Sequence, residues 1–223
     1  MPSHKIHMAI ALKANNKLKL DSDSLMLGSV LPDLSMNRNH SKAHYQKGAT
    51  DLEGLANPDE FLKDNKKYLN NPIIIGYLIH LLTDRFYNKY FFENFYLYDE
   101  NNNEIGLIMK DKKRLMNNDE AKYYKHHEFD IYDKWLLNHN YVQKFRNFDC
   151  LNNVIDFKNI KFDKAKLKNY IINNNKELNK KNIFSKMRIY NYKITNQETL
   201  DKLFNECIEY IIEYLKKEGV IND

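Results

Sequence analysis

The chain has 223 residues, of which 43% are hydrophobic and 29% charged, a balance that is ordinary for a globular protein with a buried core. Its 6 glycines and 4 prolines are too few for a turn-rich β-sandwich or barrel, so the composition favours helices. The net charge of +5 is spread along the chain. It permits weak attraction to anionic lipid or nucleic acid but indicates neither, and we expect no stable nucleic-acid partner.

Helix signals follow one another along the sequence. Two predicted helices open with Asn-Pro, at 57–58 and 71–72, which places a capping side chain before a proline in the first turn. Near the C-terminus, Thr195 and Glu198 stand at capping-box spacing, and Gly219 ends the apolar periodicity. The predicted helices cover roughly 5–18, 57–69, 71–97, 118–139, 163–179 and 195–219.

The segment 97–110, LYDENNNEIGLIMK, is the one non-helical candidate, because its Asn-rich centre separates two short apolar runs. It predicts a loop or a small hairpin. No internal repeat or linker interrupts the pattern. We therefore expect a single all-α domain over residues 1–223, a compact multi-helix fold with a core at 1–140 and a C-terminal helical extension at 141–223 packed on it.

The cysteines and the lengths of the apolar runs favour a cytoplasmic location. Cys150 and Cys207 are far apart in sequence and suit a reducing environment. The apolar stretch before Lys13 is too short for a signal peptide. The longest apolar run, PIIIGYLIHLL, is about half a membrane span and contains His80. We therefore expect a cytoplasmic protein without a transmembrane segment.

Histidines and aspartates gather in four short segments, and all 8 histidines precede residue 140. Two segments carry a His and an Asp four residues apart. The groups are His4 and His7; Asp33, His40 and His44; His80 and Asp84; and His126, His127, Asp130 and Asp133.

The four-residue spacing suits metal binding. On a helix, residues four apart project from one face with Cβ atoms about 6 Å apart. An imidazole nitrogen and a carboxylate oxygen can then converge on one ion, each about 2 Å from zinc. The two oxygens of Asp84 also permit it to bridge two metals, and a metal pair about 3.5–4 Å apart suits phosphoester hydrolysis. Gly76, one turn before His80, leaves room for another segment to pack closely.

Simpler interpretations exist for the individual residues. Either His-Asp pair alone is also explained by a local hydrogen bond or salt bridge. We expect His4 to be solvated, Asp133 to be a surface charge and His139 to lie at a helix end. The conjunction of both pairs with an N-terminal histidine and an Asp-His-His segment favours a metal site.

In this order the groups resemble the zinc-dependent phospholipase C superfamily, which also contains single-strand-specific zinc nucleases. The resemblance covers residues 1 to about 140, so this helical core is the expected metal-binding part. It implies an all-helical fold, two or three zinc ions and cleavage of phosphoric esters. The phosphoester substrate class that it implies includes phospholipids.

Position by position, the resemblance assigns the metal ligands and a general base. Asp33 follows Pro32 as the family's aspartate does, and it is implied to touch metal and to act as the catalytic base. The aspartate of the central pair is implied to bridge two zinc ions, and the second pair to hold the remaining one. His40 stays open as an alternative to His44. The implied ligands are His7, Asp33, His44, His80, Asp84, His126 and Asp130.

Two departures from the family pattern affect the interpretation. Asn88 stands where compact members carry a histidine, so the site that uses His126 and Asp130 has one ligand fewer. The C-terminal third has no recognised counterpart. The leading expectation is a zinc-dependent phospholipase C-like hydrolase with a metal-activated water. The alternatives are a nuclease- or nucleotidase-type zinc phosphoesterase and a helical binding or structural protein with a degenerate site.

Overall fold

A computed structural model describes residues 2–35, 40–46, 55–110, 112–156, 160–179 and 190–221. Its first half contains the helices α1 (His4–Leu18), α2 (Ser22–Gly28), α3 (Leu31–Leu34), α4 (His40–Ala43), α5 (Pro58–Asn65) and α6 (Pro72–Asn94), with the 3₁₀ helix η1 (Lys66–Tyr68). The second half contains α7 (Asn118–Asn138), η2 (Asp149–Asn153), α8 (Lys164–Asn179) and α9 (Gln197–Lys217). The all-α fold class is confirmed, with one small sheet added.

The chain between α6 and α7 forms the small sheet. Strands β1 (Tyr96–Tyr98), β2 (Glu104–Met109) and β3 (Lys112–Leu115) pair antiparallel in the order β1-β2-β3. The predicted hairpin corresponds to β1 and β2. Strand β3 has no signal in the sequence, because its run KKRL has neither the alternation nor the β-branched residues of a strand.

Helix starts follow the sequence signals in two cases and shift in a third. The Asn57 and Asn71 side chains accept hydrogen bonds from Glu60 N and Ile73 N, as the Asn-Pro signals predict. The capping box at Thr195 is wrong, because Asn196 caps α9 by accepting from Thr199 N. Thr195 instead donates through its backbone N and its hydroxyl to the buried Glu128 carboxylate.

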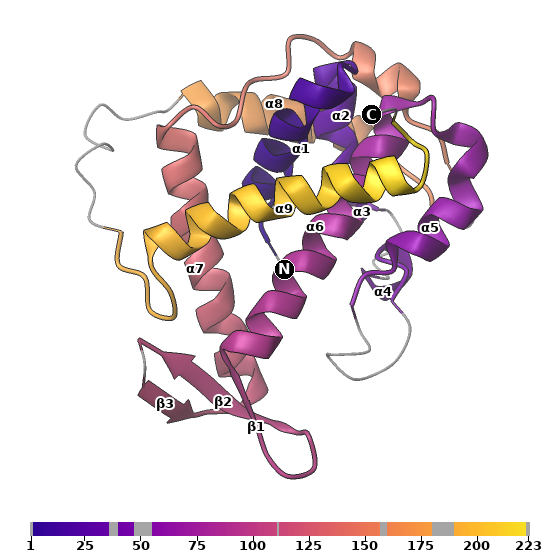
Figure 1. Cartoon of the computed structure of the whole chain (residues 1–223). Helices are drawn as coiled ribbons and strands as arrows, with labels where there is room; N and C mark the ends of the chain where they lie inside the picture. Colours follow the sequence, from indigo (N-terminus) through magenta and orange to yellow (C-terminus); the bar gives the residue numbers. More distant parts are fainter. Residues whose placement is uncertain are drawn as a thin grey trace.

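Helix α6 is the central element. It contacts α1, α2, α5 and α9, and its residues 73–84 are buried (Figure 1). The prediction that Gly76 permits close packing is confirmed, since a Cβ there would lie 2.3 Å from the Leu25 carbonyl oxygen of α2. From the other helix, a Cβ at Gly28 would lie 2.2 Å from the Ile73 carbonyl oxygen. The backbones of α2 and α6 therefore touch directly.

The C-terminal helix also reaches this centre. Helix α9 contacts both α1 and α6, and it crosses in front of them in Figure 1. Its apolar face, which includes Leu203, Cys207 and Ile211, is at most 1% exposed. In the described ranges, no helix is both long enough and apolar enough to cross a bilayer.

Candidate metal centre

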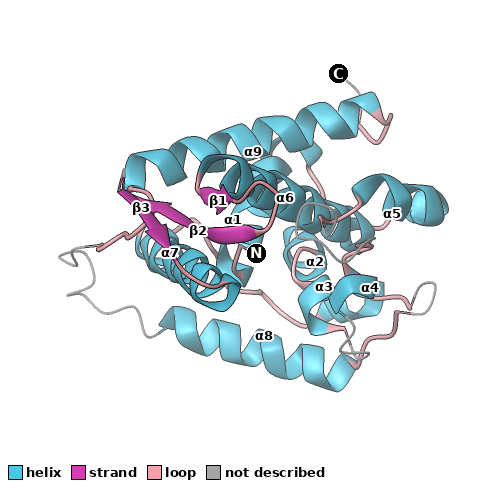
Figure 2. Cartoon of the chain, turned by 90° about the horizontal axis from the view of Figure 1, so that it is seen from below, coloured by secondary structure: helices cyan, strands magenta, loops and turns pink. Residues whose placement is uncertain are grey.

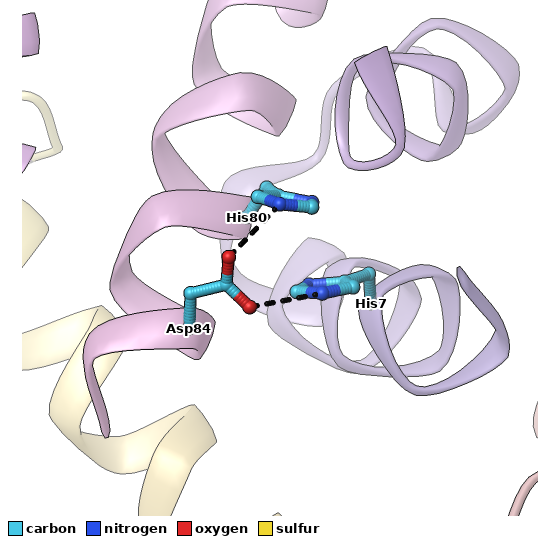
Figure 3. A group of neighbouring side chains, drawn as sticks. All are labelled: His7, His80 and Asp84. Carbon is cyan, nitrogen blue, oxygen red and sulfur yellow. Dashed lines mark ion pairs between the residues drawn. The ribbon is translucent and has the colours of Figure 1, made fainter. Parts of the chain in front are cut away.

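His80 and Asp84 project from one face of α6 toward α1 (Figure 3). His80 Nε2 lies 3.2 Å from Asp84 Oδ2, and the other ring nitrogen, Nδ1, lies 2.8 Å from the Ser29 carbonyl oxygen. A carbonyl can only accept, so Nδ1 carries a proton, and in the neutral ring Nε2 is the nitrogen that presents a lone pair. Such a backbone hydrogen bond is how metal-binding histidines are commonly oriented.

His7 comes from α1, which packs against α6. Its ring stacks on that of His80, with centroids 3.8 Å apart and planes 14° apart. Its Nε2 lies 3.4 Å from Asp84 Oδ1. The Asp84 carboxylate therefore faces His7 with one oxygen and His80 with the other, as Figure 3 shows.

His44 and Asp33 complete the cluster from α3 and the end of α4. His44 Nε2 lies 2.9 Å from His80 Nε2, 3.3 Å from Asp84 Oδ2 and 3.4 Å from Asp33 Oδ1. The Tyr77 hydroxyl of α6 donates to the Ala43 carbonyl at 2.5 Å, which fixes the backbone next to His44. The side chain of His40, the alternative to His44, lies outside the described residues.

The donor atoms stand at the separations that zinc requires. With zinc–ligand bonds of about 2.0–2.1 Å, two ligands of a tetrahedral ion lie roughly 3.3 Å apart. The contacts above span 2.9–3.4 Å. Two groups of three have all their donor atoms within 4.8 Å of one another: His7, His80 and Asp84, and Asp33, His44 and His80. His80 belongs to both groups, but its Nδ1 bonds the Ser29 carbonyl, so its Nε2 can coordinate an ion in only one of them. Asp84 is the residue with an oxygen on each side, Oδ1 toward His7 and Oδ2 toward His44.

Burial makes this arrangement costly unless a cation is bound. His7, His80 and Asp84 are each 0% exposed. Within the described chain, neither ring nitrogen of His7 and neither oxygen of Asp84 has a hydrogen-bond partner. Buried polar atoms without partners are rare and destabilising. A mixed nitrogen and carboxylate donor set suits zinc, so the residues present fit this metal.

The charges of the site are also suitable for a cation. Burial opposes ionisation of Asp84, but the positive charge of His80 outweighs it, so the pKa of Asp84 lies below its usual value. The pKa of Asp33 is likewise held well below its ordinary value, mainly by the charge of His80 against the effect of burial. Burial and the nearby His80 lower the pKa of His7 to about 4. Burial opposes a charge on His80, but Asp84 and Asp33 outweigh it and raise the His80 pKa. Both carboxylates are therefore anionic and His7 is neutral at neutral pH, and a bound cation would take the place of the His80 Nε2 proton.

A model of the family described as zinc dependent phospholipase C matches residues 3–216. The chain belongs to the zinc-dependent phospholipase C family. No curated protein and no solved structure matches it. The family match corrects the expected extent of the resemblance, which stopped near residue 140, because α8 and nearly all of α9 lie inside the matched range.

Two residues outside the predicted ligand set lie differently from the sequence expectation. His4 was expected to be solvated, yet its Nε2 lies 3.3 Å from Asp33 Oδ2, because α1 begins beside α3. Asp133 was expected to be a surface charge, yet it is half-buried and accepts a hydrogen bond from the Ser3 hydroxyl. No signal marked either contact in advance, since both join segments that are distant in sequence.

The second His-Asp pair of the family pattern is not brought into this cluster. Asp130 is exposed on α7, and His126 lines a neighbouring cavity instead. Burial and the positive charges of the N-terminus, Lys125 and Lys122 lower the pKa of His126 to about 4. Asn88 accepts a hydrogen bond at 3.2 Å from the buried Lys125 ammonium group. The assignment of His126 and Asp130 as ligands therefore stays a prediction.

A cavity of about 530 Å³ opens beside Asp33, the one cluster member that reaches the surface, with 17% of its side chain exposed. It is lined from α1, α7 and α8. The lining residues are Pro2, Ser3, His4, Lys5, Asp33, His126, Asp133, Tyr170, Asn173, Asn174 and Glu177. In this family member, the C-terminal third thus forms one wall of the space next to the candidate metal centre.

Proposed function

We propose that the chain hydrolyses phosphoric esters with zinc held by His7, Asp33, His44, His80 and Asp84. The observation that carries the proposal is the set of separations of 2.9–3.4 Å between the imidazole nitrogens and carboxylate oxygens of these five residues. Family membership supports a zinc phosphoesterase-like activity. We further propose the phospholipase C type of cleavage, in which water attacks phosphorus and releases the alcohol.

Zinc bound there would polarise the phosphoryl oxygens and bring the pKa of a nearby water toward neutrality. Asp33 is placed to orient that water and take its proton, because it is anionic and borders the cavity. His4 and His44 contact opposite oxygens of the Asp33 carboxylate, at 3.3 and 3.4 Å. These two contacts fix the direction in which the carboxylate presents its remaining lone pairs.

The cavity beside Asp33 is the proposed place for the phosphoester. Its wall offers the Lys5 ammonium group, which bonds Asn174 Oδ1 at 2.5 Å and Glu177 Oε2 at 2.8 Å. Because those partners hold Lys5 in place, its charge is presented without the cost of ordering a flexible side chain. A phosphate group bound in the cavity would meet this fixed cation in addition to the proposed ions.

Elemental analysis followed by a substrate panel tests the proposal. Protein purified without added metal should contain about two zinc ions per chain, as a dinuclear hydrolase site requires. The panel is short-chain phosphatidylcholine, a nucleoside monophosphate and single-stranded DNA. Preference for the nucleotide or the DNA would favour the nuclease-type alternative. Bound metal without any hydrolysis would favour the structural protein with a degenerate site.

Variants separate the roles. His80→Ala should lose zinc and activity together, whereas Asp33→Asn should lower kcat by about 10²–10⁴, the usual contribution of a general base. His139→Ala is the matched control, because this histidine is exposed at the end of α7. Wild-type protein that contains no zinc and stays inactive after zinc addition contradicts the proposal.

A further inference from the structure

Strand β3 forms a basic edge at the end of the molecule. Lys112, Lys113 and Arg114 are exposed, as is Lys110 in the turn before them. Among the residues that the structure describes, β3 pairs with β2 alone, and its other edge is unpaired. In the described ranges, none of these four cations has an ion-pair partner. The edge therefore presents concentrated positive charge to the surroundings.

Two exposed apolar side chains follow these cations along the chain, Leu115 in β3 and Tyr123 in α7. Leu115 is 78% exposed and Tyr123 is 67% exposed, the highest values among the large hydrophobic residues that the structure describes. Lysines on an edge strand also prevent unwanted strand pairing, which accounts for the cations but not for the exposed leucine and tyrosine. Cations next to exposed apolar groups are typical of protein surfaces that bind lipid headgroups.

The basic edge comes just before the helix that lines one wall of the cavity beside Asp33. Helix α7 begins at Asn118, just after β3, and His126 lies a little over two turns further on, about 12 Å along the axis. Tyr123 lies one turn before His126, which lines the cavity together with the N-terminal residues. Figure 2 looks at this end of the molecule and shows the three strands, the start of α7 and the N-terminus.

Nearby acidic groups only partly offset the charge. Asp119 and Glu120 are exposed in the first turn of α7. Glu120 accepts from Asn117 N in a capping box, and both carboxylates sit at the positive end of the helix dipole. Lys122 adds a further exposed cation in the next turn. The balance along this strip stays positive.

We propose that the docking edge, formed by Lys110, Lys112, Lys113, Arg114, Leu115 and Tyr123, binds the surface of an anionic phospholipid bilayer. The cations meet the lipid phosphates, and Leu115 and Tyr123 enter the interface. Tyr123 could stack on a base but the aliphatic Leu115 could not, whereas both can enter a lipid interface, so the edge fits a bilayer better than a nucleic acid. Bilayer binding does not depend on the proposed function, whereas its use in presenting phospholipid to the cavity rests on that function.

The test measures co-sedimentation of the zinc-loaded full chain with vesicles, on ice. The vesicles contain either phosphatidylcholine alone or phosphatidylcholine with phosphatidylserine. The charge variant is Lys112→Glu/Lys113→Glu/Arg114→Glu, and the apolar variant is Leu115→Ser/Tyr123→Ser. The matched control, Lys63→Glu/Lys66→Glu/Lys67→Glu, changes net charge equally at exposed positions of α5 and η1. Thermal melts verify that every variant is folded.

The wild type should bind the phosphatidylserine vesicles, and added salt should weaken that binding. The charge variant should lose affinity by at least about tenfold, since each cation near an anionic surface contributes to binding. The apolar variant should bind less tightly at every salt concentration, and the control should bind as the wild type does. Equal loss in the control, no loss in the charge variant, or edge-dependent binding to single-stranded DNA without vesicle binding overturns the proposal.

A second measurement separates this inference from the proposed function. The charge variant should hydrolyse a soluble short-chain phosphodiester at the wild-type rate but lose hydrolysis of vesicle phospholipid. If no protein hydrolyses either substrate, the proposed function fails while the vesicle-binding result still decides the docking edge. If the variant loses both activities equally, the edge has no specific role in presenting lipid.

Discussion

The Nε2 atoms of His44 and His80 face each other at 2.9 Å between α4 and α6. His80 already donates through Nδ1 to the Ser29 carbonyl, so Nε2 is the nitrogen that faces His44. Two imidazoles satisfy so short a separation by sharing one proton or by binding a common cation. The surrounding carboxylates of Asp33 and Asp84 favour the cation.

Metal removal is therefore expected to destabilise the fold. At free zinc of about 100 times the dissociation constant, binding adds about 2.7 kcal/mol to stability. For a domain of this size that corresponds to a fall in Tm of roughly 5–10 °C on chelation. Calorimetry with a chelator, then with zinc restored, measures the effect. A Tm that is the same in both conditions contradicts a buried zinc site.

The contact between α2 and α6 is expected to tolerate no added methyl group. Gly76→Ala places its Cβ 2.3 Å from the Leu25 carbonyl oxygen, so the helices must separate. Overpacking of this kind costs about 1–3 kcal/mol. The shift would also move Ser29 away from His80, so zinc content should fall together with the denaturation midpoint.

Gly219→Ala serves as the comparison for that substitution. Gly219 has a φ of +67° with nothing within 4 Å of its Cβ position, so only the backbone preference is lost, at about 1 kcal/mol. Zinc content should stay unchanged in this variant. Equal metal loss in both variants would mean that the contact between α2 and α6 does not position the ligands.

Stability should depend on pH through Asp133. Burial raises the pKa of this carboxyl from 3.8 to about 7, despite the hydrogen bond from Ser3. Because the folded pKa exceeds the unfolded one, the native state binds the extra proton between about pH 4 and 7, and stability falls as pH rises through that window. Above about pH 7 the full penalty of an ionised, half-buried group remains.

Asp133→Asn removes that penalty. The variant should be more stable than the wild type by about 1–2 kcal/mol near pH 8, after discounting for partial exposure, and equal to it near pH 4. Urea denaturation at both pH values measures the difference. Glu213→Gln, at an exposed position of α9, is the control and should change neither value. A variant that is less stable than the wild type near pH 8 would contradict the assignment.

Asn88→His tests whether the missing family histidine can simply be restored. Asn88 is buried and accepts from Lys125, whose ammonium group also lies 4.6 Å from the centre of the Phe92 ring. The acceptor nitrogen of histidine does not reach the position of the Asn88 amide oxygen, so the buried cation loses this hydrogen bond, at a cost of about 1–3 kcal/mol. The zinc content should not rise. A gain of one zinc ion, measured by elemental analysis, would instead support a third site that uses His126 and Asp130.

Local patterns predicted what local physics determines. The Asn-Pro starts of α5 and α6 and the shared face of His80 and Asp84 follow from helix geometry within one or two turns. The meeting of His7, Asp33 and His44 around that pair spans separations in sequence that no periodicity encodes. The family resemblance, and not spacing, supplied that part of the expectation.

Other details could not be predicted from the sequence because they depend on tertiary contacts. His4 looked like a terminal residue, and only the position of α3 brings Asp33 to it. Thr195 has the character of a cap, but the buried Glu128 carboxylate takes its hydrogen bonds, so the cap moves to Asn196. Strand β3 forms because β2 offers it hydrogen bonds, against the weak strand preference of its lysines.

The burial of the cluster affects how fast a metal ion can enter or leave it. The side chains of His7, His44, His80 and Asp84 have no exposed surface, and Asp33 alone reaches the outside. An ion that coordinates His7 and Asp84 must pass Asp33 or arrive before α1, α6 and α9 close around it. If the proposed function holds, exchange of an ion at His7 and Asp84 would be governed by transient opening of the helices, and such an ion would be acquired once and retained through many catalytic cycles.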